Sequence, residues 1–127
     1  MSDSKPQPTA VELEILRIVW DLEPCLVRDI HTRLHQEKGT NYSTTVKMLS
    51  IMLVKGFITR DEKVSPHIYR SVLTRQKAGK RFLVDLIDKV YEGSATSLVL
   101  QALSGRKASI EEITAIRNLL DSMENRK

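Results

Sequence analysis

The chain has 127 residues, a formal net charge of +4 and a hydrophobic content of 41%, which is typical of one globular domain, or of one small domain with an appendage. No stretch approaches the roughly 20 apolar residues of a membrane-spanning helix, and residues 1–8 carry no secretory apolar run. The single cysteine, Cys25, excludes an internal disulfide and a multi-cysteine metal site, and its neighbour Leu26 favours burial. We expect a cytoplasmic protein with a disordered N-terminus over residues 1–8.

The first predicted helix begins after Thr9. The sequence from Thr9 to Glu12 has the spacing of a capping box, and Pro24 ends the helical pattern. The apolar residues of this segment recur at spacings of three and four: Val11, Ile15, Ile18, Val19 and Leu22. They predict one stripe that faces a core.

The next segment predicts a very short strand at Cys25 and a second helix over residues 27–37, in which Val27, Ile30 and Leu34 repeat with helical spacing. His31 and His35 stand four residues apart on this helix, which is a spacing that metal sites use. No third ligand accompanies them. We therefore expect solvated or lightly packed histidines and no bound metal.

A third helix is predicted from Ser43, as its N-cap, to Gly56, as its left-handed terminator. Its expected core side consists of Thr45, Leu49, Met52 and Leu53, with Val46 at the edge. Its other side consists of Thr44, Lys47, Met48, Ile51 and Lys55. An outward Met or Ile is costly in water, so this face predicts either contact with a partner surface or packing under the following hairpin or a neighbouring subunit.

Residues 57–62 and 67–73 alternate with a period of two around a polar turn, which predicts a hairpin. Three short helices followed by a hairpin is the order of a winged helix-turn-helix domain, whose third helix enters the DNA major groove. In that groove Met48 and Ile51 can pack on thymine methyl groups, and Thr44 and Lys47 can bond to bases or phosphates. Arg60, His67 and Arg70 are the expected wing or backbone contacts.

Charge is concentrated in this part of the chain. Residues 38–81 contain ten basic and two acidic residues, a net charge of +8, which leaves −4 for the remainder. A basic block in an otherwise acidic chain is typical of a phosphate-binding surface, although a solvated face can also collect Lys and Arg.

Three further amphipathic helices are predicted after Thr74, with Ser94 and Ser109 as N-caps of the last two. Their apolar surface exceeds what they can bury alone, and a symmetric dimer would cover it. The expected dimerisation residues are Leu83, Leu86, Ile87, Leu98, Leu100, Leu103, Ile113, Ile116, Leu119 and Leu120. The predicted fold is mainly α: a winged helix over residues 9–73 with a two- or three-stranded wing, followed by a helical dimerisation domain over residues 74–127.

Four segments resemble the penicillinase repressor family of winged-helix transcriptional repressors: Glu-Leu-Glu-Ile-Leu-Arg-Ile-Val-Trp ending at Trp20, Tyr-Ser-Thr-Thr-Val-Lys-Met-Leu from Tyr42, His-Ile-Tyr-Arg from His67, and Gly-Ser-Ala-Thr-Ser-Leu-Val-Leu from Gly93. The resemblance covers Thr9 to about Met123. It implies a homodimer on a palindromic operator, often near genes of β-lactam resistance, with a membrane metalloprotease sensor that triggers repressor cleavage.

By this resemblance, the recognition-helix contacts are Ser43, Thr44, Lys47, Met48 and Ile51, with Tyr42 and Lys55 on the DNA backbone. Val46 and Ile51 stand where members that govern penicillinases often carry arginine, so the resemblance implies a different operator sequence. The copper-responsive relatives carry a C-terminal cysteine cluster that this chain lacks. The bond equivalent to the scissile Asn-Phe bond of the family is Gln101-Ala102.

A protein-interaction module or a small RNA-binding helical domain is the alternative reading of the same basic, amphipathic segments. No enzyme is predicted, because the chain has no Gly-rich phosphate loop, no plausible catalytic triad and no convergent carboxylate pair. We expect no cofactor and no small-molecule substrate.

Overall fold

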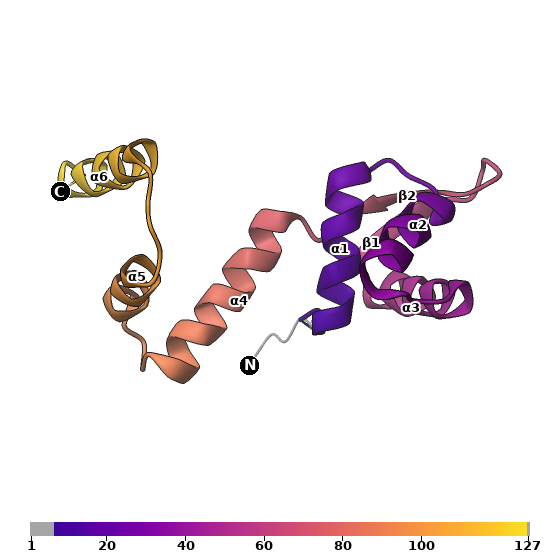
Figure 1. The fold of residues 1–127 in the computed structure, drawn as a ribbon, viewed down its shortest axis with the longest axis horizontal. Coiled ribbons are helices and arrows are strands. Elements are labelled where there is room, and N and C mark those ends of the chain that lie inside the picture. The colour runs from indigo at the N-terminus through magenta and orange to yellow at the C-terminus, as the bar shows by residue number, and fades with distance from the viewer. Residues whose placement is uncertain (1–6, 127) are drawn as a thin grey trace. The chain divides into compact units, whose positions relative to one another are not determined.

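The computed structural model describes residues 7–126, so most of the predicted disordered N-terminus, residues 1–6, lies outside the described residues. The elements are α1 (Ala10–Leu22), α2 (Val27–Lys38), α3 (Tyr42–Lys55), β1 (Ile58–Asp61), β2 (Ile68–Ser71), α4 (Arg75–Val90), α5 (Ala95–Ser104) and α6 (Ile110–Glu124). A hairpin follows three helices, and further helices follow the hairpin (Figure 1). The predicted fold class, a mainly α winged helix with C-terminal helices, is confirmed.

The chain divides into two compact units, and the boundary between them in the sequence lies within α4, between Leu83 and Val84. The predicted boundary between residues 73 and 74 falls just before α4. Ala78, in the first turn of α4, is buried in the core of the first unit. The first two turns of α4 therefore belong to the winged-helix unit.

Helix α1 begins with the predicted capping box: Glu12 N–H donates to Thr9 Oγ1 at 3.2 Å, and Thr9 N–H donates to Glu12 Oε1 at 2.9 Å. Its core face contains Ile15, Ile18 and Val19, as predicted, together with Leu16. The predictions for Val11 and Leu22 are wrong, because 47% and 37% of their surfaces are exposed. The core stripe is thus centred on the middle of the helix, and both of its ends are more exposed.

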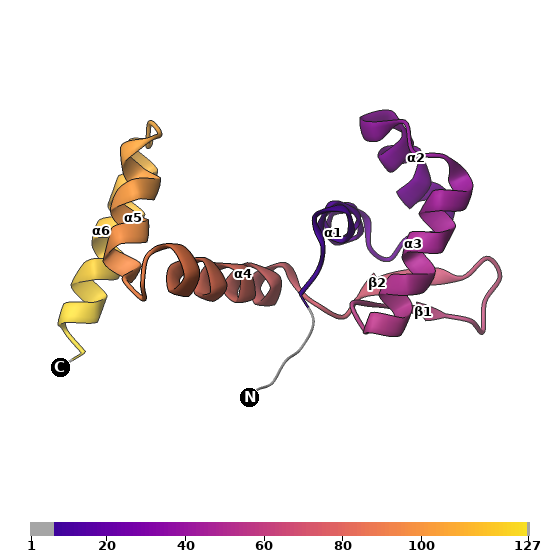
Figure 2. The same cartoon turned by 90° about the horizontal axis from the view of Figure 1, so that it is seen from below.

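The hairpin pairs β1 with β2 in antiparallel register, with Ile58 opposite Ser71 and Asp61 opposite Ile68. The short strand expected at Cys25 is a single β-bridge to Tyr69, in which Cys25 N–H donates to Tyr69 O at 3.1 Å and Tyr69 N–H donates to Cys25 O at 2.7 Å. This bridge ties the segment between α1 and α2 to the wing. Figure 2 shows the hairpin beside α3, with its turn extending beyond the helices.

Cys25 is buried, as predicted, and carries a free thiol. Burial, together with the nearby carboxylates of Asp29 and Glu23, raises the pKa of this thiol to about 11. Cys25 is therefore neutral at physiological pH and packs as a small apolar side chain.

In the second unit, Ser94 caps α5 by accepting from Ser97 N–H, and Ser109 forms a capping box with Glu112 on α6. Both caps were predicted. Neither α5 nor α6 contains a buried residue. Across residues 7–126, no helix combines the length and the apolar character needed to cross a membrane.

Candidate nucleic-acid interface

Helix α3 begins two residues earlier than predicted, because Asn41 and not Ser43 is its N-cap. Asn41 Oδ1 accepts from Thr44 N–H at 2.9 Å and from the hydroxyl of Ser43, also at 2.9 Å. Asn and Ser are both favourable N-cap residues, and the sequence alone did not distinguish Asn41 from Ser43. Ser43 therefore lies inside the first turn and is exposed.

The first turn of α3 is fixed to α2 by a buried hydroxyl. Thr45 is fully buried, and its Oγ1 lies 2.9 Å from His31 Nδ1 and 3.3 Å from Asn41 O. All three groups are satisfied when His31 Nδ1–H donates to Thr45 and the Thr45 hydroxyl donates to Asn41 O. The His31 ring also packs edge-on against Tyr42, with 5.2 Å between ring centroids. His31 thus orients the N-terminal end of α3.

His35 has a comparable role one turn further along α2. Its Nδ1 lies 3.0 Å from Thr40 O, in the connection between α2 and α3. The two histidine rings lie 5.7 Å apart. Within the part of the chain that the structure describes, no group of three His, Cys, Asp or Glu side chains could hold a metal ion.

The outward face of α3 differs from the predicted one at two apolar positions. Met48 is half-buried and packs against the core, and Ile51 is also half-buried. The expectation that Met48 points outward is therefore wrong, because it lies at the edge of the core side. The exposed apolar residues are Val46, at 39%, and Val54, at 89%.

Polar residues occupy the N-terminal part of this face. Tyr42, Ser43, Thr44 and Lys47 are all exposed. They project from the first two turns of the helix, where unsatisfied backbone N–H groups already favour negative charge. This segment can donate hydrogen bonds to an anion and to polar base edges.

Lys55, at the other end of α3, has a structural partner. Its Nζ lies 2.8 Å from Glu12 Oε2, and the Glu12 side chain is only 2% exposed. Burial raises the pKa of Glu12, but hydrogen bonds from Lys55 and Thr9 and the charge of Lys55 outweigh it, so the pKa lies below its ordinary value. Lys55 thus neutralises a buried carboxylate. The sequence shows Glu12 only as a capping residue and gives no sign of this ion pair.

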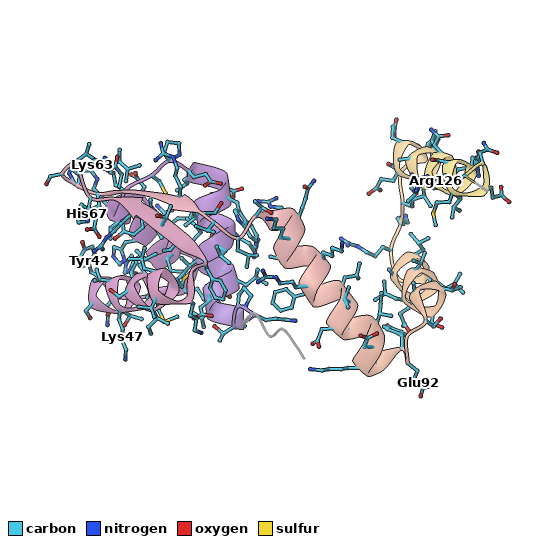
Figure 3. All side chains as sticks on the ribbon, turned by 180° about the vertical axis from the view of Figure 1, so that it is seen from behind. Tyr42, Lys47, Lys63, His67, Glu92 and Arg126 are labelled. Carbon is cyan, nitrogen blue, oxygen red and sulfur yellow. The ribbon has the colours of Figure 1, made fainter. Side chains whose placement is uncertain are left out.

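The three predicted wing residues occupy different surroundings. Arg60 is held by Glu62, with Nε 2.8 Å from Oε2, and by Tyr69, with Nη1 3.1 Å from Oη. Arg70 is exposed on the hairpin opposite Thr59. His67 lines the same cavity as Tyr42. Figure 3 shows Tyr42, His67 and Lys63 at the same end of the first unit. The structure therefore brings the hairpin turn close to the N-terminal end of α3.

Replacing Thr45 by Val should destabilise the protein by about 1–2 kcal/mol, because the change removes a buried hydroxyl and leaves His31 Nδ1–H without its partner. Urea unfolding measures this loss. Thr44→Val is the matched control, because the Thr44 side chain is exposed and the same β-branched change occurs one residue away. Equal stability of the two variants would show that the contact between His31 and Thr45 contributes nothing.

Comparison with known proteins agrees with this architecture. The family model described as "Penicillinase repressor" matches residues 8–122. The chain is 25% identical over 121 residues to the methicillin resistance regulatory protein MecI of Staphylococcus aureus (strain N315), which covers 95% of this chain and 98% of that protein. It is 22% identical over 122 residues to the penicillinase repressor of Bacillus licheniformis, with coverage of 96% and 95%. The penicillinase repressor of Staphylococcus aureus is 18% identical over 126 residues, with coverage of 99% and 100%.

The family match covers most of the chain, and the relatives align over nearly their whole length. The resemblance drawn from the sequence is thereby confirmed, and with it the expectation of a repressor that binds DNA and regulates transcription. The chain belongs to the penicillinase repressor family, a family of DNA-binding transcriptional repressors and not of enzymes.

Proposed function

We propose that this protein is a cytoplasmic, homodimeric repressor that binds a palindromic DNA operator through α3 and the wing. The observation that carries the proposal is the first two turns of α3, where Tyr42, Ser43, Thr44 and Lys47 are exposed on a helix that the core holds firmly. Buried Thr45, Leu49 and Met52 fix the opposite face. A helix held in this way can present side chains to base edges without losing much conformational freedom.

Within the proposed surface, Lys47 and Tyr42 are assigned to phosphates, and Ser43 and Thr44 to base edges. Val46 takes the apolar role predicted for Met48, because it is exposed and can contact a thymine methyl group. Ile51 is half-buried and lies at the margin of this proposed DNA-binding surface. Arg70 and His67 remain proposed backbone contacts from the wing, whereas Lys55 and Arg60 already bind Glu12 and Glu62.

The proposed dimer rests on the apolar surface of the second unit. Leu100 is 64% exposed, and Leu119 and Leu120 are each 56% exposed. A cavity of about 420 Å³ between α5 and α6 is lined by Leu103, Ile113, Ile116 and Leu120, among others. So much exposed apolar surface is unusual for a monomer. A second copy of the chain would bury it with the twofold symmetry that a palindromic operator requires.

We further propose that cleavage of the Gln101-Ala102 bond by a membrane metalloprotease sensor releases the repressor. Gln101 and Ala102 are exposed in the last turns of α5. Cleavage there would separate α6 from the rest of the chain and remove Ile113, Ile116, Leu119 and Leu120 from the dimer. Derepression would follow, because a single winged helix reaches only one half-site.

Lys47→Ala should lower DNA affinity and reduce the slope of log affinity against log salt by about one, because one phosphate contact and its released counterion are lost. Fluorescence anisotropy on a labelled duplex between about 50 and 200 mM salt measures both quantities. Lys107→Ala is the matched control, since it removes the same charge from the connection between α5 and α6. The assignment of Lys47 fails if both variants behave alike.

Thr44→Ala should change which duplexes the protein prefers, at a cost of about 1–3 kcal/mol for each lost base contact. The preference is measured by selection from a randomised duplex library. Ser50→Ala serves as control, because Ser50 is also exposed on α3 but lies nearly two turns further from its N-terminus. If Thr44→Ala selects the same sequences as the unaltered protein, Thr44 does not contact a base.

A further inference from the structure

The C-terminal end of α1 holds the short connection between the hairpin and α4. The indole N–H of Trp20 donates to Leu73 O at 2.9 Å, and the Leu73 side chain is buried. Just after α1, Glu23 Oε1 accepts from Ser71 N–H at 2.7 Å, and the Ser71 hydroxyl lies 3.0 Å from both oxygens of the same carboxylate. The chain that leaves β2 is therefore fixed on α1 before α4 begins.

The first residue of α4 contacts the same end of α1. The guanidinium of Arg75 lies over the Trp20 ring, 5.3 Å from its centroid, and its Nη2 lies 3.2 Å from Asp21 Oδ1. The other oxygen of this carboxylate, Asp21 Oδ2, lies 3.2 Å from Nη2 of Arg33 on α2. Asp21 thus links α2 to α4. We call Trp20, Asp21 and Arg75 the α4 clamp.

The contacts of Arg75 restrict geometry more than they stabilise the fold. The side chains of Asp21 and Arg75 are 53% and 64% exposed, and ion pairs at such exposed positions contribute little to stability. A guanidinium that stacks on a ring and also binds a carboxylate is nevertheless held in one orientation, because both contacts depend on its plane. The α4 clamp therefore fixes the direction in which α4 leaves the core of the first unit.

From this geometry we propose that the α4 clamp determines how strictly the repressor selects the spacing between its two half-sites. The proposal rests on the proposed function, in which α5 and α6 join two copies of the chain. Helix α4 is continuous from Arg75 to Val90, so a direction set at its first turn is carried along the helix into the second unit. A loose joint at this point would let the two winged helices reach half-sites at several spacings.

The test compares two duplexes with the full-length protein: the one most enriched from a randomised library, and the same duplex with two base pairs inserted between its half-sites. The insertion rotates one half-site by roughly 70° about the DNA axis. Arg75→Ala should reduce the ratio of the two affinities about fivefold, because the looser joint tolerates the rotation. Trp20→Phe should act in the same direction, since it keeps the ring and removes the hydrogen bond to Leu73. Lys80→Ala is the charge-matched control, at an exposed position of the same helix.

The ratio of affinities separates this role from two others. A phosphate contact or a purely stabilising role of Arg75 would lower the affinity for both duplexes by the same factor, and such a result overturns the proposal. So does a ratio in Arg75→Ala that equals the ratio in Lys80→Ala. All variants should sediment as dimers, because the clamp lies outside α5 and α6. If the unaltered protein enriches no paired half-sites, the proposed function itself fails, which differs from variants that discriminate as strictly as the unaltered protein.

Discussion

A chain that ends at Gln101 is expected to sediment as a monomer and to bind its operator at least about a hundredfold more weakly than the full chain. Truncation removes the apolar side chains of α6, and each fully buried side chain of this kind contributes about 1.5–3 kcal/mol to an interface. With the dimer lost, the second half-site no longer binds at the high effective concentration that the first one creates. Analytical ultracentrifugation and operator titration measure the two effects.

A point substitution in α6 tests the loss of the dimer without removing residues 102–127 from the chain. Leu120→Asp places a charge in the apolar surface of α6 and should also give a monomer, whereas Asn118→Asp adds the same charge on the same helix at a polar position and should stay dimeric. Both residues are exposed in the single chain, so neither change disturbs a core. A truncated chain that remains dimeric and binds like the full protein would exclude cleavage at Gln101-Ala102 as the release mechanism.

Replacing Lys55 by Met is expected to destabilise the protein by about 2 kcal/mol at pH 7. Breaking a buried ion pair costs 3–5 kcal/mol in fully buried cases, and the lower value applies because the Lys55 side chain is 33% exposed. The buried carboxylate of Glu12 is then left without a cation. Urea unfolding at several pH values measures the loss.

The sign of the pH dependence should reverse between the two proteins. In the unaltered protein the folded-state pKa of Glu12 lies below the reference value of 4.5, so this group stabilises the fold above that pH and the stabilisation is lost in acid. In Lys55→Met, burial without a cation raises the pKa of Glu12, so the variant regains stability as pH falls from neutrality. The difference between the two proteins should narrow on acidification.

Glu12→Gln/Lys55→Met should recover most of the lost stability at pH 7, because Gln keeps the capping box on α1 and leaves no buried charge. A constant difference between Lys55→Met and the unaltered protein from pH 7 to pH 5 would contradict this account of the ion pair.

The elements of this fold follow from the sequence because their signals are local. The capping boxes at Thr9 and Ser109, the left-handed Gly56 and the alternating hairpin all depend on residues a few positions apart. Each of these patterns predicts a hydrogen bond or a backbone conformation that residues close together in the sequence can form by themselves. These elements were predicted with small errors at their ends.

The surroundings of individual side chains are set by contacts between distant segments. Lys55 pairs with Glu12 across 43 residues, and His31 meets Thr45 across 14. Met48 lies at the margin of the core face of α3, where helical periodicity alone cannot decide between burial and exposure. The cavity that Tyr42 and His67 both line depends on the approach of the hairpin turn to the helices, which no periodicity in the chain encodes.

The central claim, a dimer that recognises a palindrome through α3, is tested most directly by selecting bound duplexes from a randomised library with the full-length protein and sequencing them. The proposal predicts two inverted half-sites whose centres lie about 10 base pairs, or a multiple of that, apart. It also predicts that Thr44→Ala alters the bases within both half-sites and leaves their spacing unchanged, since α5 and α6 set the spacing. Enrichment of single, unpaired sites, or no enrichment over the starting library, would contradict the claim.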